Sequence, residues 1–94
     1  MPQILTKDLE KIGLQPNEAK IYLALLELGQ GTVTQISKLA GLNRTTGYDI
    51  LERLCLHGVT NRNVSGKKRT YVAEPPSRLN QYLENKKKQA ERRL

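Results

Sequence analysis

The side chains best suited to contacting another molecule are concentrated in residues 41–54, which read GLNRTTGYDILERL. An arginine guanidinium can donate a pair of hydrogen bonds to guanine, a threonine methyl group can meet the methyl group of thymine, and a tyrosine hydroxyl can reach a base or a phosphate. Helices that read DNA present such groups at their N-terminal end. The candidate base-reading residues are therefore Asn43, Arg44, Thr45, Thr46 and Tyr48.

Residues 43–57 are predicted to form the helix that carries these groups. The side chain of Asn43 is expected to cap its N-terminus, with a phosphate contact as a possible addition. Arg44 would then occupy the first helical position and project from the helix end. At about 100° per residue, one face must pack inward, and it consists of Gly47, Ile50, Leu51 and Leu54.

The same helix carries acidic residues on the face expected to meet DNA. Because carboxylates repel phosphates, we expect Asp49 and Glu52 to orient neighbouring side chains rather than to contact DNA. The candidates for such orientation are Arg44, Arg53 and Tyr48. Acceptance of a hydrogen bond from cytosine remains the alternative for both carboxylates.

Gly47 is unusual on an inward face, because glycine costs about 1 kcal/mol relative to alanine inside a helix. Either a neighbour such as Tyr22 or Tyr71 fills the space beside it, or the helix packs loosely. If the space is empty, Gly47→Ala should raise the melting temperature.

A second basic group follows in residues 59–73. The segments VTNRNV and RTYVA are predicted to be short strands around SGKK, with Ser65 and Gly66 at the tip of the hairpin. Its cations are Arg62, Lys67, Lys68 and Arg69, with no acid between positions 62 and 69. We expect them to contact phosphates beside the minor groove, which adds affinity more than sequence choice. The alternative is a solvated hairpin tip.

The elements before residue 43 must position both groups. A short amphipathic helix through Leu5, Leu9 and Ile12 is followed by a central helix that begins at Pro16 and ends before Gly29. A short β-branched piece then leads into a helix over residues 35–40, capped by Thr34, with Ile36, Leu39 and Ala40 buried. Its N-terminus places Thr34 and Gln35 where they can bind a backbone phosphate. Two short helices joined by a turn with glycine are typical of a helix-turn-helix.

Residues 77–94 are predicted to form a last, basic helix, separate from a DNA-binding domain over residues 1–76. Its apolar positions, interrupted by Lys86, give a modest coiled-coil pattern. The helix is expected to mediate dimerisation or to link to a further effector domain. The dimerisation residues would be Leu79, Leu83, Ala90 and Leu94.

The net charge of +7 lies entirely in the second half, where twelve Lys and Arg face five acids in residues 41–94. Such asymmetry favours a polyanionic partner, with DNA ahead of a membrane.

The apolar core is aliphatic and thin, which suggests a homodimer. No apolar run reaches the roughly 20 residues of a membrane span, and Cys55 is predicted to be a buried thiol in a reducing cytoplasm. A nucleoid-associated protein of the cytoplasm is expected.

Enzymatic arrangements are not expected. His57 is the only histidine and precedes a glycine at a predicted helix end, where capping of carbonyls is its simplest role. One histidine and one cysteine cannot hold a metal ion alone. We therefore expect a protein that is no enzyme, with no metal and no cofactor.

Three blocks of the sequence resemble the N-terminal winged-helix domain of TrmB-type transcriptional regulators: LEKIGLQPNEAKIYLALLELG, ISKLAGLNRTTGYDILERL and GKKRTYVAEPPSRL. The resemblance implies a mainly α fold with a small β-hairpin, a winged helix-turn-helix, in a usually dimeric activator or repressor that often controls sugar metabolism. The sequence departs from the family at Gly47, where an aliphatic residue is usual. Many members continue into a sugar-binding domain, so a sugar effector is expected only if such a domain follows.

The leading hypothesis is a sequence-specific regulator that binds double-stranded DNA, with residues 43–57 in the major groove and the hairpin on the backbone or minor groove. One alternative is a sequence-neutral chromosomal protein, which would bind all duplexes equally. Another is a winged helix used for protein interaction in the transcription machinery, which would bind DNA weakly.

Overall fold

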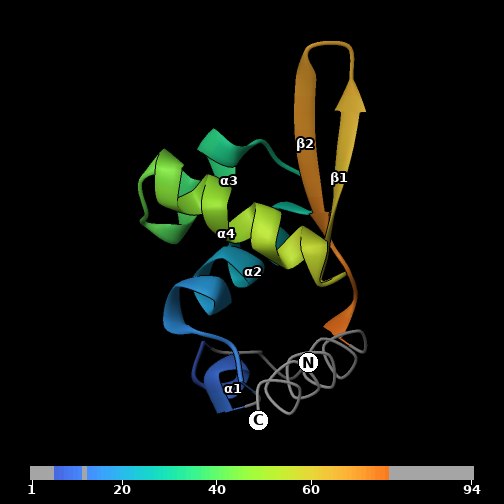
Figure 1. Ribbon diagram of the computed structural model, residues 1–94. Coiled ribbons are helices and arrows are strands. Elements are labelled where there is room, and N and C mark those ends of the chain that lie inside the picture. The colour runs from blue at the N-terminus through green and yellow to red at the C-terminus, as the bar shows by residue number, and fades with distance from the viewer. Residues whose placement is uncertain (1–5, 12, 77–94) are drawn as a thin grey trace, which may run out of the picture.

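The computed structural model describes residues 6–11 and 13–76. In chain order they form α1 (Thr6–Lys11), α2 (Pro16–Leu28), α3 (Val33–Ala40), α4 (Arg44–Leu56), β1 (Thr60–Ser65) and β2 (Lys68–Ala73) (Figure 1). The predicted mainly helical class with a small hairpin is therefore confirmed. The helix predicted over residues 77–94 lies outside the described residues, as do Leu5 and Ile12. None of the described helices has the length and apolar character needed to span a bilayer.

Helix α2 lies at the centre of the core, as its apolar run predicts. Ile21, Tyr22 and Leu25 are fully buried, and α1 contributes Leu9. The inward face predicted for α4 is also confirmed, since Gly47, Ile50, Leu51 and Leu54 are all buried.

The buried carboxylate of Glu18 connects α2 to α4. Glu18 accepts a hydrogen bond from the backbone N–H of Gln15 at 2.8 Å and from Arg53 Nε at 3.1 Å.

Helix α3 begins earlier than predicted, because its cap is Thr32 and not Thr34. The Thr32 hydroxyl accepts from the Gln35 N–H at 3.2 Å, and the Gln35 side chain accepts from the Thr32 N–H at 3.0 Å. This reciprocal capping box satisfies backbone donors at the helix start. The β-branched piece expected here is therefore mostly helical. Leu39, predicted to be buried, is 46% exposed, whereas Ile36 is buried.

The hairpin is antiparallel, and its register pairs Ser65 with Lys68. The loop therefore consists of Gly66 and Lys67, one position later than the predicted tip. Gly66 has a φ of 62°, as the first position of a type II′ turn requires. Figure 1 shows the hairpin projecting beyond the helices, with its turn at the far end.

The base of the hairpin is attached to the helical part at several points. Gly31 and Tyr71 exchange backbone hydrogen bonds of 3.1 and 2.8 Å. The Tyr22 hydroxyl donates to the Glu74 carbonyl at 2.7 Å, and burial raises the pKa of Tyr22 to about 12, with a further contribution from the charge of Glu74. These contacts attach the base of the hairpin to the helical part.

Candidate nucleic-acid interface

The N-terminus of α4 is capped as the sequence predicts. Asn43 has an extended backbone, and its side-chain oxygen accepts a hydrogen bond from the Thr46 N–H at 2.8 Å. Arg44 is the first helical residue and is exposed. Thr45 is exposed as well, whereas Thr46 is half-buried. The cap thus leaves Arg44 and Thr45 available to a ligand.

A neighbouring side chain fills the space beside Gly47, as one of the two alternatives predicts, but it is Ser37 of α3 and not Tyr22 or Tyr71. A Cβ atom on Gly47 would lie 1.8 Å from Ser37 Oγ and 3.0 Å from Ser37 Cβ. Ser37 is buried, and its hydroxyl has no hydrogen-bond partner among the described residues. The expectation of a loosely packed helix is therefore wrong, because α4 lies against α3 with no room for a methyl group.

A hollow of about 310 Å³ lies between the first turns of α3 and α4 and the end of the hairpin. Of the residues that the structure describes, three cationic side chains line it and no carboxylate does. Five of the eleven predicted contact residues meet here, although they come from three separate elements. The lining residues are Thr32, Val33, Thr34, Arg44, Tyr48, Lys67 and Arg69.

Arg69 is held at this hollow by tyrosine side chains. A hydrogen bond to the Tyr48 hydroxyl, followed by one to Tyr71, raises the pKa of Arg69 above its usual value. Both partners are hydroxyl groups and not carboxylates, so they leave the charge of Arg69 in place. Tyr48, which is 38% exposed, thus connects the helix to the hairpin.

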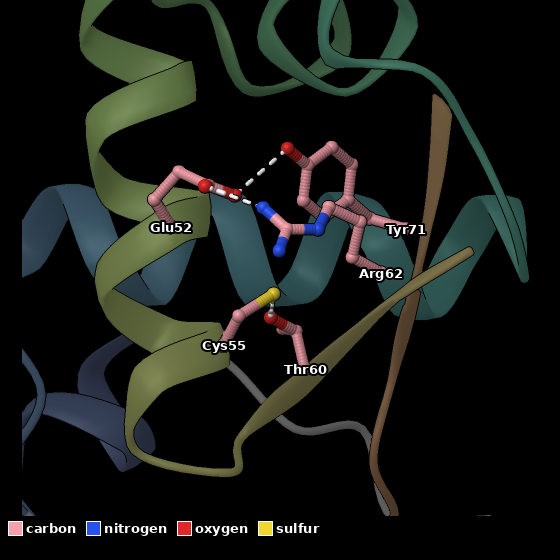
Figure 2. Close-up of polar contacts among 5 residues, drawn as sticks. All are labelled: Glu52, Cys55, Thr60, Arg62 and Tyr71. Atoms are coloured by element: carbon pink, nitrogen blue, oxygen red, sulfur yellow. Dashed lines mark hydrogen bonds and ion pairs between the residues drawn. The ribbon is translucent and has the colours of Figure 1, made fainter. Parts of the chain in front are cut away.

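Arg62 does not reach the hollow, although the sequence groups it with the other hairpin cations. Its Nη1 lies 2.6 Å from Glu52 Oε1, and the hydroxyl of Tyr71 donates to Glu52 Oε2 at 3.0 Å (Figure 2). Glu52 therefore orients Arg62 and Tyr71, not the predicted Arg44, Arg53 or Tyr48.

Five further predicted contact residues do not line the hollow either: Asn43, Thr45, Thr46, Lys68 and Gln35. Lys68 is exposed on β2 but does not line it. The side-chain oxygen of Gln35 is engaged in the capping box. The predicted dimerisation residues lie outside the described residues: Leu79, Leu83, Ala90 and Leu94.

Sequence reasoning missed the roles of Ser37 and Tyr71. Nothing in the sequence marks Ser37 as the neighbour of Gly47, because the contact joins two helices. A signal did exist for Tyr71. Alternation along a hairpin places Arg62 and Tyr71 on one face once their register is known, and the register pairs them directly.

Cys55 lies on the side of α4 that faces the hairpin. Its Sγ is 3.0 Å from Thr60 Oγ1 (Figure 2). Burial raises the pKa of Cys55, and the hydrogen bond with Thr60 partly opposes that shift. The thiol is half-buried rather than fully buried as predicted. Among the described residues, no group of three or more His, Cys, Asp or Glu side chains could hold a metal ion.

Comparison with known proteins shows consistent similarities. Residues 9–77 match the family described as sugar-specific transcriptional regulator TrmB. The HTH-type sugar sensing transcriptional regulator TrmBL1 of Pyrococcus furiosus is 38% identical over 74 residues, which are 79% of this chain and 21% of that protein. The chain thus spans about a fifth of the length of this curated relative.

Solved structures agree in fold. TrmBL2, an archaeal chromatin protein, superposes with a TM-score of 0.74 at 21% identity, over 94% of this chain and 34% of that one. A MarR family transcriptional regulator from Silicibacter pomeroyi gives a TM-score of 0.65 at 24% identity, over 92% of this chain and 52% of that one. The described residues therefore have a winged-helix fold.

Proposed function

The chain belongs to the TrmB family of transcriptional regulators, and on this premise we propose that it binds double-stranded DNA with the N-terminus of α4 and the hairpin. Helix α4 would enter the major groove, and the hairpin would follow the sugar-phosphate backbone towards the minor groove. The winged-helix arrangement supports this assignment, because it presents a helix and a hairpin on one side of the molecule.

The observation that carries the proposal is the hollow of about 310 Å³ between α3, α4 and the hairpin. Arg44, Lys67 and Arg69 line it without a carboxylate, and Thr34 and Tyr48 add hydroxyl groups. Cations and hydroxyl donors around one concave site suit a phosphate of the DNA backbone. The site therefore joins the two DNA-contacting elements at one phosphate.

The proposal divides affinity from specificity. Thr45 extends from the capped end of α4 and would contact a base edge. Arg44 would reach past the rim of the hollow to a guanine, which leaves the phosphate there to Lys67 and Arg69. Lys67, Lys68 and Arg69 of the hairpin would contact phosphates and supply the salt-dependent part of the affinity. The acidic partner of Arg62 reduces the contribution of that arginine.

We further propose that the regulator is a sequence-specific homodimer, paired through the helix predicted over residues 77–94. Two-fold pairing would place half-sites about one helical turn apart, or a multiple of it. A sugar effector belongs to this proposal only if the protein continues into a sugar-binding domain, as the name of the TrmBL1 relative suggests.

Selection of bound duplexes from a random library, followed by titration of Arg44→Ala, tests this function. We expect a preferred site with paired half-sites. Arg44→Ala should lower the ratio of specific to mixed-sequence affinity by about tenfold or more, because one bidentate base contact contributes about 1–3 kcal/mol to discrimination. Lys68→Ala is the matched control, since it removes one cation outside the hollow and should weaken binding to both duplexes equally.

Two outcomes would contradict parts of the proposal. Equal affinity for every duplex would indicate a sequence-neutral chromosomal protein. An unchanged affinity ratio in Arg44→Ala, with a preferred site present, would show that Arg44 does not read bases.

A further inference from the structure

We propose that Glu52 is a positioning residue for the DNA-binding surface: it holds the hairpin against α4 and thereby directs Arg69 into the hollow. The inference rests on the proposed function. It assigns a favourable role to a carboxylate that lies near the expected path of a polyanion.

The geometry around Glu52 ties both strands of the hairpin to one helix. Its Oε1 lies 2.6 Å from Arg62 Nη1 on β1, and its Oε2 lies 3.0 Å from the Tyr71 hydroxyl on β2. Arg62 and Tyr71 are directly opposite in the register. Figure 2 shows the carboxylate reaching from α4 towards both side chains. A single residue of α4 thus contacts both strands.

The chemistry of the contacts sets their direction. A carboxylate only accepts hydrogen bonds, so Tyr71 must use its one O–H to reach Glu52. The Tyr71 oxygen is then left as an acceptor, and a guanidinium is a donor only. Arg69 stands two residues before Tyr71 on β2, and therefore on the same face of the strand, and it lines the hollow together with Tyr48. It is the group that fits. The orientation of Arg69 therefore depends on Glu52 through Tyr71.

Glutamine at position 52 keeps the size of the side chain but disturbs this order. Its amide group offers N–H donors where Arg62 and the Tyr71 hydroxyl already donate. The amide oxygen can still accept from Arg62, but an N–H group facing Tyr71 makes that hydroxyl the acceptor, in competition with Arg69. The arrangement that leaves the Tyr71 oxygen for Arg69 is therefore lost. Charge-assisted hydrogen bonds of this kind are stronger than neutral ones.

If Glu52 acted only through its negative charge, its removal would change the DNA affinity in the opposite direction. A carboxylate near DNA repels phosphates, so its removal should tighten binding. Asp49 provides the matched control, because it is an exposed acid on the same helix, three residues before Glu52. Asp49→Asn removes the same charge without touching the hairpin contacts.

The experiment titrates a mixed-sequence duplex with the wild type, Glu52→Gln and Asp49→Asn, each with and without Arg69→Ala. We expect Asp49→Asn to bind at least as tightly as the wild type. Glu52→Gln should bind about five- to tenfold more weakly and lose about one unit of salt slope, as if one phosphate contact were gone. Arg69→Ala should then have little further effect in the Glu52→Gln background.

The proposal is overturned if Glu52→Gln behaves like Asp49→Asn, or if Arg69→Ala weakens binding by the same factor in both backgrounds. A readout without DNA separates it from the proposed function. The guanidinium N–H signals of Arg69 in an NMR spectrum should be protected from exchange in the wild type and in Asp49→Asn, and should lose that protection in Glu52→Gln. Failure of the wild type to bind DNA, with this NMR pattern present, would refute the function but not the positioning role.

Tyr71→Phe provides a second variant in case Glu52→Gln does not fold. It keeps the buried ring and removes only the hydroxyl that joins Glu52 to Arg69. The same loss of Arg69 protection is expected, and full retention of protection would overturn the proposal.

Discussion

Helix α4 meets α3 and the hairpin in two different ways. Against α3 the contact is steric, because Gly47 approaches Ser37 so closely that no Cβ fits between them. Against the hairpin the contact is polar and partly open to solvent, through Glu52, Arg62 and Tyr71. Glu52 and Arg62 are 29% and 42% exposed.

The difference shows how one helix can be packed rigidly against α3 and still hold the hairpin through contacts that depend on solvent conditions. Close packing fixes the distance between two helices and is insensitive to salt or pH. Hydrogen bonds between charged groups depend on ionisation and on competing water. The helix-turn-helix is thus the rigid part of the DNA-binding surface, and the attachment of the hairpin is the part that responds to conditions.

The largest expected effect comes from breaking the steric contact. Gly47→Ala should lower the free energy of unfolding by at least about 2 kcal/mol. Overpacking against Ser37 Oγ and Ser37 Cβ costs about 3 kcal/mol, and the better helix propensity of alanine offsets about 1 kcal/mol of it. Chemical denaturation at several salt concentrations would measure it, and the loss should be independent of salt.

The control for this prediction removes the obstruction on α3. Ser37→Gly combined with Gly47→Ala should be closer to the wild type in stability than Gly47→Ala alone. A higher melting temperature for Gly47→Ala would instead mean that α3 and α4 are further apart than described.

The second-largest expected effect is that alkaline pH weakens the attachment of the hairpin. The pKa of Tyr22 is raised to about 12, and burial and Glu52 raise that of Tyr71. An unfolded tyrosine ionises near pH 10, so the unfolded state releases its proton first. The stability contributed by these hydroxyls is complete below pH 10 and is lost as pH rises towards 12, by about 2 kcal/mol for Tyr22.

Urea unfolding at pH 8, 10 and 11.5 measures this loss. The free energy of unfolding should fall between pH 10 and 11.5 by roughly the amount that linkage requires. Tyr22→Phe should remove part of the pH dependence because it removes one of the two groups. A stability independent of pH in this range would contradict the buried state of both hydroxyls.

The smallest expected effect separates two arginines of the hairpin. Arg69→Ala should weaken binding to mixed-sequence DNA by about tenfold and lower the salt slope by about one, because its charge is uncompensated at the hollow. Arg62→Ala should weaken binding by less than about threefold, because Glu52 already neutralises its charge. Equal effects of both substitutions would contradict the distinction drawn from their partners.

The local features were predictable from sequence, and the contacts between elements were not. The inward face of α4 and the Asn43 cap follow from spacing and residue type alone. The Thr32 cap was also present in the sequence, because Thr32 and Gln35 have the spacing of a capping box and Thr34 has no such partner. That error was one of interpretation.

The pairing of Arg62 with Glu52 was beyond sequence reasoning for a physical reason. The charge of a residue is known from its type, but its neutralisation depends on the register of a hairpin and on the side of α4 that the hairpin meets. The same holds for Gly47 and Ser37, whose contact depends on how two helices cross. Composition therefore counts the cations of the hairpin correctly and overstates how many of them are available to DNA.

The attachment points of the hairpin also bear on how the chain folds. The strands can pair with each other early, because they are joined by a short loop. Their attachment to the helices brings together residues that are distant in the sequence. Gln30 and Thr70 are 40 positions apart, and Tyr22 and Glu74 are 52 positions apart. Such loops are entropically costly to close, so we expect docking of the hairpin to be a late step of folding. The amide protons of Gly31 and Tyr71, which bond across that junction, are the natural reporters of this step in hydrogen exchange.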